Sequence, residues 1–556
     1  MTGGLSKTNR YLLAGAGVIG LLAIGLPEAK AQDLKSIQGQ IDSLNATVQN
    51  QQATIKALQK QVQDAKAQAT EAQTTAASAK GSDLDLKVKW KGAPEFSSAD
   101  GKFKFKVRGR LETDYNSINQ DTPVTSFPDV SGTELRRARL GIEGTMFYDW
   151  KYVFEVDFAN DVVQAKDAYL QYQGLKISDT PVLFRVGNFK TFNSFEEETS
   201  DRFVDTMERA AFINAWDLER QIGLGTMYYS EHFGLAAGIF GQRFASTSNA
   251  PLFPGFVGNE DTTWAARAFA SPINRDVNGV TQVLHFGASF RNRDAGDDQP
   301  LFQYGNRATG AALHLANAPI QTGRIGEEDT FWGLEAVGLW GPFSLQGEYA
   351  NLDVDLPGGE FVRNNPPGAN QLTTITNPLR GISSPSYNGW YVEGSWFFGG
   401  HKTYEDEGRW GRPKINHPMF HESGGWGALQ IVGKYDVLDM GTSSVLGPNE
   451  SIGSNGFPNG VGPCLTTRLF PGLGSNSNSL QAPGIAECGD MKTWTVTANW
   501  WMTEYMRIMF EYSESDLSGY PTTPLVANST QLASGNVNGF DGGTIRGFGT
   551  RFQVDW

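Results

Sequence analysis

The amino-acid sequence predicts an all-β transmembrane barrel of about sixteen antiparallel strands, preceded by an α-helical coiled coil. Two observations predict the barrel: apolar and polar residues alternate in stretches that begin and end with aromatic residues, and short connections alternate with long ones. A third observation, a seven-residue repeat near the N-terminus, predicts the coiled coil.

Composition excludes two other classes of protein. Apolar residues make up 39% of the chain and the mean hydropathy is -0.36, which argues against a membrane protein built from helices. The net charge of -14 argues against a nucleic-acid partner, because nucleic-acid-binding proteins present a basic surface. Aromatic residues at 12% and 65 glycines indicate many strands and turns.

Residues 1–31 have the pattern of a secretory signal peptide. Lys7 and Arg10 are followed by the apolar run Tyr11–Leu26 and by the small-x-small cleavage site Ala29–Ala31. The apolar run is shorter than the roughly 20 residues that a membrane-spanning helix needs. We therefore predict a signal peptide over residues 1–31, a coiled coil and linker over 32–86, and a barrel over 87–556.

The segment after the signal peptide is expected to be helical. Apolar or small residues recur in alternating steps of three and four from Leu34 to Ala79, and Gln51 interrupts them. This repeat is typical of a left-handed coiled coil, in which a buried polar residue such as Gln51 fixes register and strand number. The protein should then oligomerise, although the core residues alone do not choose between two and three strands. The alternative is an Ala/Gln-rich linker without fixed structure.

From Lys87 onward the period changes to two. The stretch WKYVFEVDF, which begins at Trp150, has aromatic and aliphatic residues on one face and mainly charged residues on the other. The same division recurs in Phe331–Trp340, Trp390–Phe397, Trp494–Trp500 and Phe548–Trp556. Faces with aromatic ends and apolar centres match a lipid-facing band between two aromatic girdles, whereas the outward face of a soluble β-sandwich is polar.

Alternate connections between these strands are very short. Examples are YD before Trp150, SEH around Glu231, GP at Gly341 and MTE at Met502. Between them lie long polar segments such as 292–329 and 436–491. Short periplasmic turns and long outer loops are the pattern of a barrel in the outer membrane of a Gram-negative bacterium, which would place the coiled coil in the periplasm.

Cations occupy every second position in the first half of FKFKVRGRLETDYN, which begins at Phe103. In a barrel strand the apolar residues would face lipid and the cations would line the lumen. The cations are Lys104, Lys106, Arg108 and Arg110. Cations that line a lumen favour the passage of anions.

The next strand adds Arg137 and Arg139 to the same inner wall. Arg136 has the wrong parity unless a bulge near the strand end turns it inward. The alternative to an anion path is that these arginines pair with lumen carboxylates such as Glu143 and Glu155.

The two cysteines, Cys464 and Cys488, lie in a Gly/Asn/Pro/Ser-rich segment without periodicity. A disulfide that ties a long outer loop is favoured over a metal or catalytic site. The six histidines are scattered, and His417 and His421 fit a polar periplasmic turn better than a metal site. We therefore predict no enzyme, no catalytic residues, no metal and no cofactor.

Four stretches resemble the phosphate-selective porin O and P family. They are KVKWKGAPEFSSADGKFKFKVRGRLETDY from Lys87, LRRARLGIEGTMFYDWKY from Leu135, GNFKTFNSFEEETSDRFVDTMERA from Gly187 and GRPKINHP from Gly411. The resemblance covers the chain from Lys87 to its end, and a coiled-coil extension also occurs among relatives. It implies a homotrimeric outer-membrane barrel, surrounded by lipid and inserted by the barrel assembly machinery, in which an arginine ladder leads small anions such as phosphate to a narrow zone.

The resemblance also assigns roles to individual residues. It makes Arg110, Arg136 and Arg137 ladder positions, and Arg209 a basic position of the third loop, which folds into the lumen. Phosphate-binding relatives carry a lysine and two adjacent serines in that loop and an aspartate behind the ladder. The matching positions here are Glu197, Ser200, Asp201 and Lys166, so one serine remains.

The third loop of this chain is acidic. Its constriction residues Glu196, Glu197, Ser200, Asp201 and Arg202 lie in a stretch with six acids and only two arginines. Such a loop repels phosphate unless other cations outweigh it, and the candidates on later strands are Arg267, Arg291, Arg293 and Lys434. We expect an anion-favouring porin, while a general or sugar-conducting pore, or a barrel that anchors a periplasmic tether, remain open alternatives.

Overall fold

The computed structural model describes most of the barrel and a part of the N-terminal segment. The described residues are 49, 52–53, 55–57, 59–67, 86–120, 129–159, 163–241, 262–277, 279–295, 302–306, 320–356, 361–363, 373–375, 384–420, 424–441, 489–518 and 542–556. The predicted signal peptide and the predicted disulfide between Cys464 and Cys488 lie outside them. The chain divides into two units between Leu84 and Asp85, which are described separately.

In the N-terminal unit, residues 49, 52–53, 55–57 and 59–67 are helical. Ile55 and Val62, two positions of the heptad repeat, are 53% and 56% exposed in the single chain. A helix is thus present within the predicted segment, and its association with other chains stays a prediction. No helix among the described residues is long and apolar enough to span a membrane.

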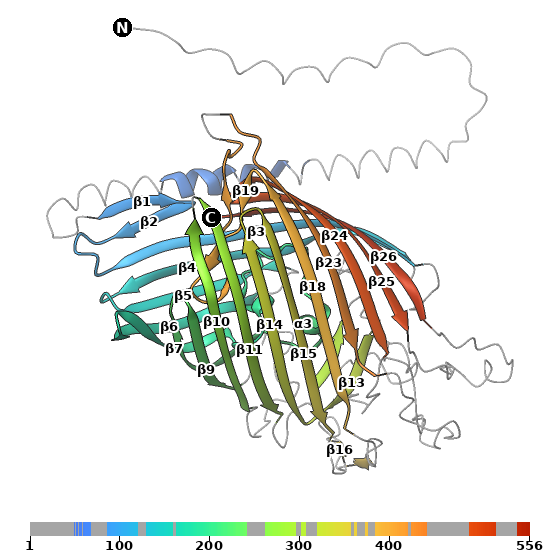
Figure 1. Cartoon of the computed structure of the whole chain (residues 1–556). Helices are drawn as coiled ribbons and strands as arrows, with labels where there is room; N and C mark the ends of the chain where they lie inside the picture. The colour runs from blue at the N-terminus through green and yellow to red at the C-terminus, as the bar shows by residue number, and fades with distance from the viewer. Residues whose placement is uncertain are drawn as a thin grey trace, which may run out of the picture. The chain divides into compact units, whose positions relative to one another are not determined.

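The second unit is built on a sheet of 18 antiparallel strands, sixteen of which close into a barrel (Figure 1). In order around the barrel they are β3 (Lys104–Gln120), β4 (Val130–Met146), β5 (Trp150–Asp157), β6 (Gln164–Ile177), β7 (Thr180–Lys190), β8 (Arg220–Tyr229), β9 (Phe233–Phe240), β10 (Thr262–Val277), β11 (Val280–Asp294), β14 (Glu328–Trp340), β15 (Phe343–Asp355), β18 (Ser386–Phe398), β23 (Ala428–Asp439), β24 (Asp490–Thr503), β25 (Met506–Ser518) and β26 (Gly542–Asp555). Strand β26 pairs with β3, with Phe552 opposite Thr113, and so closes the ring.

The remaining elements lie beside or between these strands. The hairpin of β1 (Lys87–Lys91) and β2 (Ala93–Ser97) continues the sheet next to β3. The connection between β7 and β8 contains α2 (Phe195–Glu198) and α3 (Ala211–Ala215). Four small hairpins or ladders complete the set: β12 (Phe302–Asn306) with β13 (Ile320–Gly326), β16 (Phe361–Arg363) with β17 (Thr373–Ile375), β19 (Gly400–His401) with β22 (Lys414–Ile415), and β20 (Tyr404–Glu405) with β21 (Arg409–Trp410).

The connections alternate in length, as the sequence predicts, so the barrel has a short-turn end and a long-loop end. Ser178 and Asp179 join β6 to β7 with φ of 49° and 66°, the mirror-image turn that matches the twist of a hairpin. One connection departs from this pattern. Residues 399–427, between β18 and β23 at the short-turn end, are long and carry a hairpin that enters the barrel. The sequence predicts only a polar turn there.

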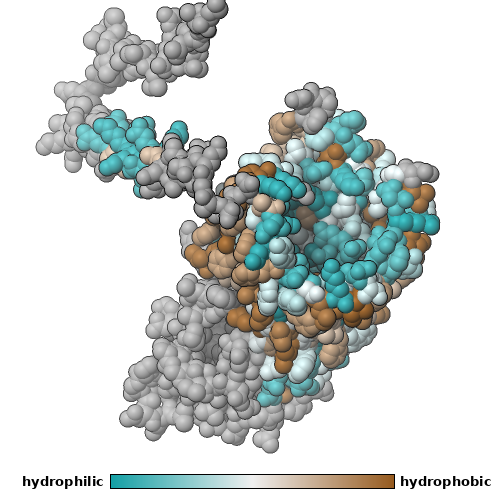
Figure 2. All heavy atoms as spheres, turned by 90° about the vertical axis from the view of Figure 1, so that its left-hand side faces the viewer, coloured by the Kyte–Doolittle hydropathy of each residue, from teal (hydrophilic) through white to brown (hydrophobic). Residues whose placement is uncertain are grey.

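The two faces of the wall differ as the alternation predicts. Leu140 and Leu224 are 50% and 54% exposed on the outside, whereas Glu112 and Thr497 are buried inside. Figure 2 shows hydrophobic residues on the outer wall and hydrophilic residues around the hollow. Exposed tryptophans mark both ends of the outer face: Trp264, Trp332 and Trp494 toward the long loops, and Trp150, Trp340 and Trp396 toward the short turns.

A hydrophobic cluster fills part of the barrel interior. Phe212 and Trp216, from the connection between β7 and β8, pack with Tyr304 of β12 and with Tyr387 and Tyr391 of β18. Their side chains are almost completely buried. The loops on this side therefore occupy lumen space, and the open path must lie elsewhere.

Candidate functional site

The connection between β7 and β8, residues 191–219, is the third loop, and it is fastened inside the barrel. Three wall carboxylates accept hydrogen bonds from its main-chain N–H groups. They are Glu348, from Phe195 at 3.0 Å and Glu196 at 2.8 Å; Asp436, from Ala211 at 2.6 Å; and Glu511, from Met207 at 2.7 Å. Ser194, in a left-handed conformation with φ of 56°, donates its hydroxyl to Glu348 at 3.1 Å. These contacts fix the loop at three points of the wall.

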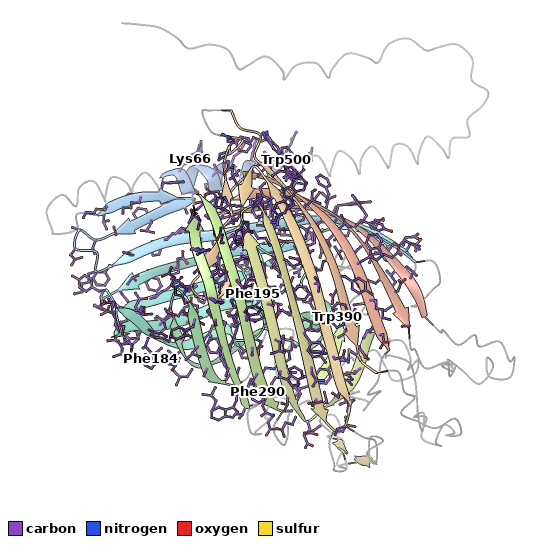
Figure 3. All side chains as sticks on the ribbon, viewed as in Figure 1. Lys66, Phe184, Phe195, Phe290, Trp390 and Trp500 are labelled. Carbon is purple, nitrogen blue, oxygen red and sulfur yellow. The ribbon has the colours of Figure 1, made fainter. Side chains whose placement is uncertain are left out.

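The inward hairpin, residues 400–415, meets the third loop from the opposite end. The hydroxyl of Tyr404 lies 2.6 Å from both His285 Nδ1 and Ser271 Oγ, which ties the hairpin to β11 and β10. The Trp410 ring packs edge-on against the Phe195 ring, with centroids 5.3 Å apart; Phe195 lies inside the barrel (Figure 3). The N–H of Trp410 also donates to Thr199 Oγ1 at 3.3 Å. The two inserted segments are thus in direct contact.

The cations of the later strands bind the inserted segments or the wall beside them. Arg267 pairs with Glu335 at 2.6 Å, Lys434 pairs with Glu196 at 2.6 Å, and Arg291 donates to the carbonyl of Trp216 at 3.0 Å. Arg293 pairs with Asp329, and its guanidinium lies 4.2 Å from the centre of the Phe302 ring of β12. These four cations, which the sequence could not place, are buried and hold loops rather than an open path.

Inward cations that keep contact with solvent lie on the opposite side, on β3 to β7. Lys104 is exposed, and Lys106, Arg108, Lys151, Lys166 and Arg185 are half-buried. We call the inner face of β3 to β8 the conduit wall.

The predicted ladder faces inward on this wall. Arg110, Arg137 and Arg139 are 3%, 5% and 6% exposed. The register between β3 and β4 shifts at Glu112, so that Arg136 is an extra residue of a bulge. Arg136 then binds Glu208 of the third loop with hydrogen bonds of 2.7 and 2.9 Å. This is the bulge that an inward Arg136 requires.

The Asp201 carboxylate of the third loop lies at the centre of the ladder. Its Oδ2 is 3.3 Å from Arg110 Nη1, 3.2 Å from Arg137 Nε and 3.3 Å from Arg139 Nη1, and its Oδ1 pairs with Arg209. Burial disfavours the charged form, but the positive charges of these arginines prevail and hold the pKa of Asp201 well below its ordinary value. Four arginines therefore share one carboxylate supplied by the protein itself.

Further carboxylates neutralise the ladder from the wall side. Glu112 pairs with Arg110 at 3.4 Å and with Arg137. Glu155 lies 3.0 Å from Arg108, 3.4 Å from Arg139 and 3.7 Å from Arg202 of the third loop. Glu143 also pairs with Arg108, at 3.0 Å. Pairing with lumen carboxylates, the alternative left open by the sequence, thus describes the geometry of most ladder arginines.

The other predicted positions of the third loop have separate partners. Glu197 pairs with Arg209 at 3.1 Å and lies 3.7 Å from Lys190, while Glu196 pairs with Lys434. Ser200 accepts a long 3.5 Å hydrogen bond from the N–H of Arg202. Lys166 lies at an irregularity of β6, apart from Glu197, Ser200 and Asp201 in its contacts.

Five inward cations have no carboxylate oxygen within 4.0 Å in the described part of the chain. They are Lys104, Lys106, Lys151, Lys166 and Arg185. The register connects three of them in one line across five strands, from Lys104 through Thr145, Lys151 and Gln171 to Arg185. We call Lys104, Lys151 and Arg185 the inner cation row; it lies toward the short-turn end.

Sequence reasoning missed Arg185 and Lys151 as site residues. Arg185 alternates with the exposed residues Phe184, labelled in Figure 3, and Val186, so parity alone places it inside. Lys151 stands opposite the apolar face of β5 in the same way. The described residues contain no group of three or more histidine, cysteine or carboxylate side chains suited to a metal ion.

Comparisons with known proteins add a family and relatives. The family model for phosphate-selective porin O and P matches residues 105–537. An uncharacterised protein of Caulobacter vibrioides is 27% identical over 463 residues, which are 80% of this chain and 85% of that protein. Porin O of Pseudomonas aeruginosa is 28% identical over 297 residues, which are 48% of this chain and 62% of Porin O.

Solved structures of outer-membrane barrels are similar to this chain with lower sequence identity. An anion-selective porin from Comamonas acidovorans has a TM-score of 0.40 at 9% identity, covering 82% of this chain and all of that one (100%). The trimer form of the outer-membrane protein OmpT of Vibrio cholerae has a TM-score of 0.39 at 11% identity, covering 82% and 99%.

Proposed function

The chain belongs to the phosphate-selective porin O and P family and is an outer-membrane porin, and from this premise we propose that it is a passive channel for small anions without a dedicated phosphate site. The observation that carries the proposal is the Asp201 carboxylate held by Arg110, Arg137, Arg139 and Arg209. An oxyanion that entered this place would have to displace a carboxylate already bound by all four arginines. Tight binding of phosphate is therefore not expected there.

Anion preference then rests on cations that are not already neutralised. The five inward cations that have no carboxylate partner among the described residues line the conduit wall, and the inner cation row lies on the short-turn side of the ladder. In a narrow lumen their fields are screened less than those of surface charges in bulk water. A small anion passing the neutralised ladder would meet these cations next, which supports a moderate preference for anions.

Reversal potential under a salt gradient tests this proposal. Wild-type channels in a planar bilayer should prefer chloride over potassium, and K104Q/K151Q/R185Q should lose most of that preference. Lys492, exposed on the outer face of β24, provides the control K492Q, which should behave like the wild type. A wild-type channel that prefers potassium would overturn the proposal.

We further propose that the porin is a homotrimer. Strands β5 and β9 have 8 residues each, fewer than the roughly 9–11 that a strand needs to cross a bilayer. The outer face of β9 is aliphatic, with Leu235 and Ile239 exposed. A wall too low for lipid needs protein beside it, and a copy of the same chain supplies it. Cross-linking in membranes should yield monomers, dimers and trimers and no larger species.

A further inference from the structure

The tip of the inward hairpin is acidic and faces the lumen. It runs Tyr404–Trp410 (YEDEGRW), with three carboxylates and one arginine. Arg409 pairs with Glu405 at 2.7 Å and with Glu407 at 3.5 Å, yet the two carboxylate side chains remain 37% and 41% exposed. Asp406 is exposed as well. The tip therefore carries a surplus of negative charge in contact with solvent.

The position of the tip is fixed by the wall. Arg267 donates to the main-chain carbonyls of Glu407 at 3.2 Å and Gly408 at 2.6 Å. Gly408 has a φ of 70°, and a Cβ at this position would come within 2.6 Å of the Phe269 ring. The close approach needs glycine, and the carboxylates next to it cannot swing away with the main chain.

The acidic tip is anchored on Arg267 of β10, whereas the inner cation row lies on β3, β5 and β7 at the same end of the barrel. Burial disfavours the charged form of Glu407, but the charge of Arg409 and a hydrogen bond from the residue's own main-chain N–H prevail and hold the pKa of Glu407 below its ordinary value. The positive charges of Lys151 and Arg185 act in the same direction. Lys151 and Arg185 act at a distance, because neither has a carboxylate oxygen within 4.0 Å among the described residues. Glu407 is therefore ionised at neutral pH and faces cations that it does not touch.

The cations of the wall and the carboxylates of the hairpin tip are each held by neighbours on their own side, so they do not form ion pairs with each other. Arg185 donates to Gln171 through Nε at 2.9 Å and Nη2 at 2.7 Å, and its guanidinium lies 4.3 Å from the centre of the Tyr169 ring. Arg409 holds Glu405 and Glu407 on the hairpin. The short-turn end of the conduit therefore has a cationic wall and an anionic wall that do not collapse into ion pairs.

We propose that this two-sided region binds and passes zwitterionic solutes, with their anionic group toward Lys151 and Arg185 and their cationic group toward Glu405 and Glu407. A plain anion is attracted by one wall and repelled by the other, whereas a small zwitterion satisfies both. Opposed charges in a lumen of reduced dielectric stabilise a dipole that lies across the path. This inference rests on the proposed channel function and deepens it by naming a second class of solute.

Uptake into proteoliposomes tests the inference with three labelled solutes of similar size: zwitterionic β-alanine, anionic propionate and neutral lactamide. Wild-type protein should take up β-alanine severalfold faster than lactamide. E405Q/E407Q should reduce β-alanine uptake to the lactamide rate while propionate uptake rises. K151Q/R185Q should lower the uptake of both β-alanine and propionate.

Controls separate charge from assembly and this inference from the channel function. D406N changes an exposed side chain and should cause a smaller loss in the same direction. K492Q/D516N removes one cation and one carboxylate, paired across β24 and β25 on the outer face, and should leave all three rates unchanged. If E405Q/E407Q assembles normally and still prefers β-alanine, the inference is wrong. If wild-type channels prefer chloride but take up β-alanine no faster than lactamide, only the inference fails; a potassium preference contradicts the channel proposal instead.

Discussion

Asp201 belongs to the third loop, yet its closest partners include three arginines of the barrel wall. Arg110 and Arg137 come from neighbouring strands, and they also share Glu112. Counting cations along the sequence therefore overstates the charge that a solute meets. A cation next to a carboxylate contributes little net field to the lumen, whereas a cation without one contributes its full field.

Replacing Asp201 should create a site for oxyanions. In D201S the four surrounding arginines lose a carboxylate, and an ionised hydrogen-bond partner contributes roughly 1.5–3 kcal/mol. The phosphate concentration that halves chloride conductance should fall about tenfold or more, since each 1.4 kcal/mol is tenfold. K492Q, on the outer face of β24 and away from this cluster of ion pairs, is the control. Unchanged phosphate block in an assembled D201S channel contradicts the assignment.

The pH dependence of the same contact has a definite sign. The folded-state pKa of Asp201 lies well below its ordinary value, so its contribution to stability is complete above the unfolded-state pKa and is lost as pH falls through the folded-state value. Lowering the pH from about 7 to about 5 leaves Asp201 ionised, because an unperturbed aspartate titrates near 3.9. Phosphate block at pH 5, corrected for phosphate's own ionisation, should therefore stay as weak as at pH 7.

At the scale of elements, two inserted segments shape the lumen, and only one was foreseen. Stretches of alternating residues fixed the strands and their inner faces, since a two-residue period leaves no other choice. The same parity placed Arg136 on the outer face unless a bulge intervened, and the register of β3 and β4 contains that bulge. The hairpin at 400–415 has strands of two residues, too short for any period, and its contacts with His285 and Ser271 come from distant positions. Such long-range pairing leaves no local signal in one sequence.

Removing the wall carboxylate under the third loop should loosen it. In E348A the N–H groups of Phe195 and Glu196 lose their acceptor, and each unsatisfied buried donor costs about 1–3 kcal/mol. We expect faster hydrogen exchange over residues 193–199 and noisier single-channel current. S344A, on the same strand, breaks only a hydrogen bond to Ser395 within the wall and should leave both measurements unchanged. Equal exchange in E348A and wild type counts against a fastened loop.

A disulfide between Cys464 and Cys488 remains a prediction for the long loop that joins β23 to β24. Both thiols should resist alkylation until the protein is reduced, because the compartment is oxidising. Replacement of both cysteines should leave barrel assembly intact, since only a loop is tied. Two alkylated cysteines in protein never exposed to reductant would exclude it.

At the scale of the whole molecule, the barrel and the N-terminal helix each point to more than one chain. The low wall at β5 and β9 needs a neighbour, and the heptad repeat with Gln51 needs partner helices. Sequence periodicity predicts the existence of the helix but not its strand number, because that choice depends on packing between chains. The proposal that several chains associate thus rests on two unlike features in separate units.

The helix supplies a test of its own. In the isolated peptide of residues 32–81, Q51L should raise the melting temperature, because a polar residue in a coiled-coil core lowers stability while it fixes register. Analytical ultracentrifugation should show three chains for the wild-type peptide and a less defined number for Q51L. If the peptide is monomeric and unstructured at high concentration, the coiled-coil prediction is wrong.

The contact between the third loop and the inward hairpin determines which segments must be exchanged together to transfer the solute selectivity of one relative to another. Trp410 packs on Phe195, its N–H bonds to Thr199, and Lys402 pairs with Asp205. In a chimera whose residues 191–219 come from a relative, the inward hairpin would still have the side chains that fit the original third loop. Exchange of both segments together should give channels with a steady single-channel current. Exchange of either segment alone should give barrels that assemble poorly or have an unsteady current.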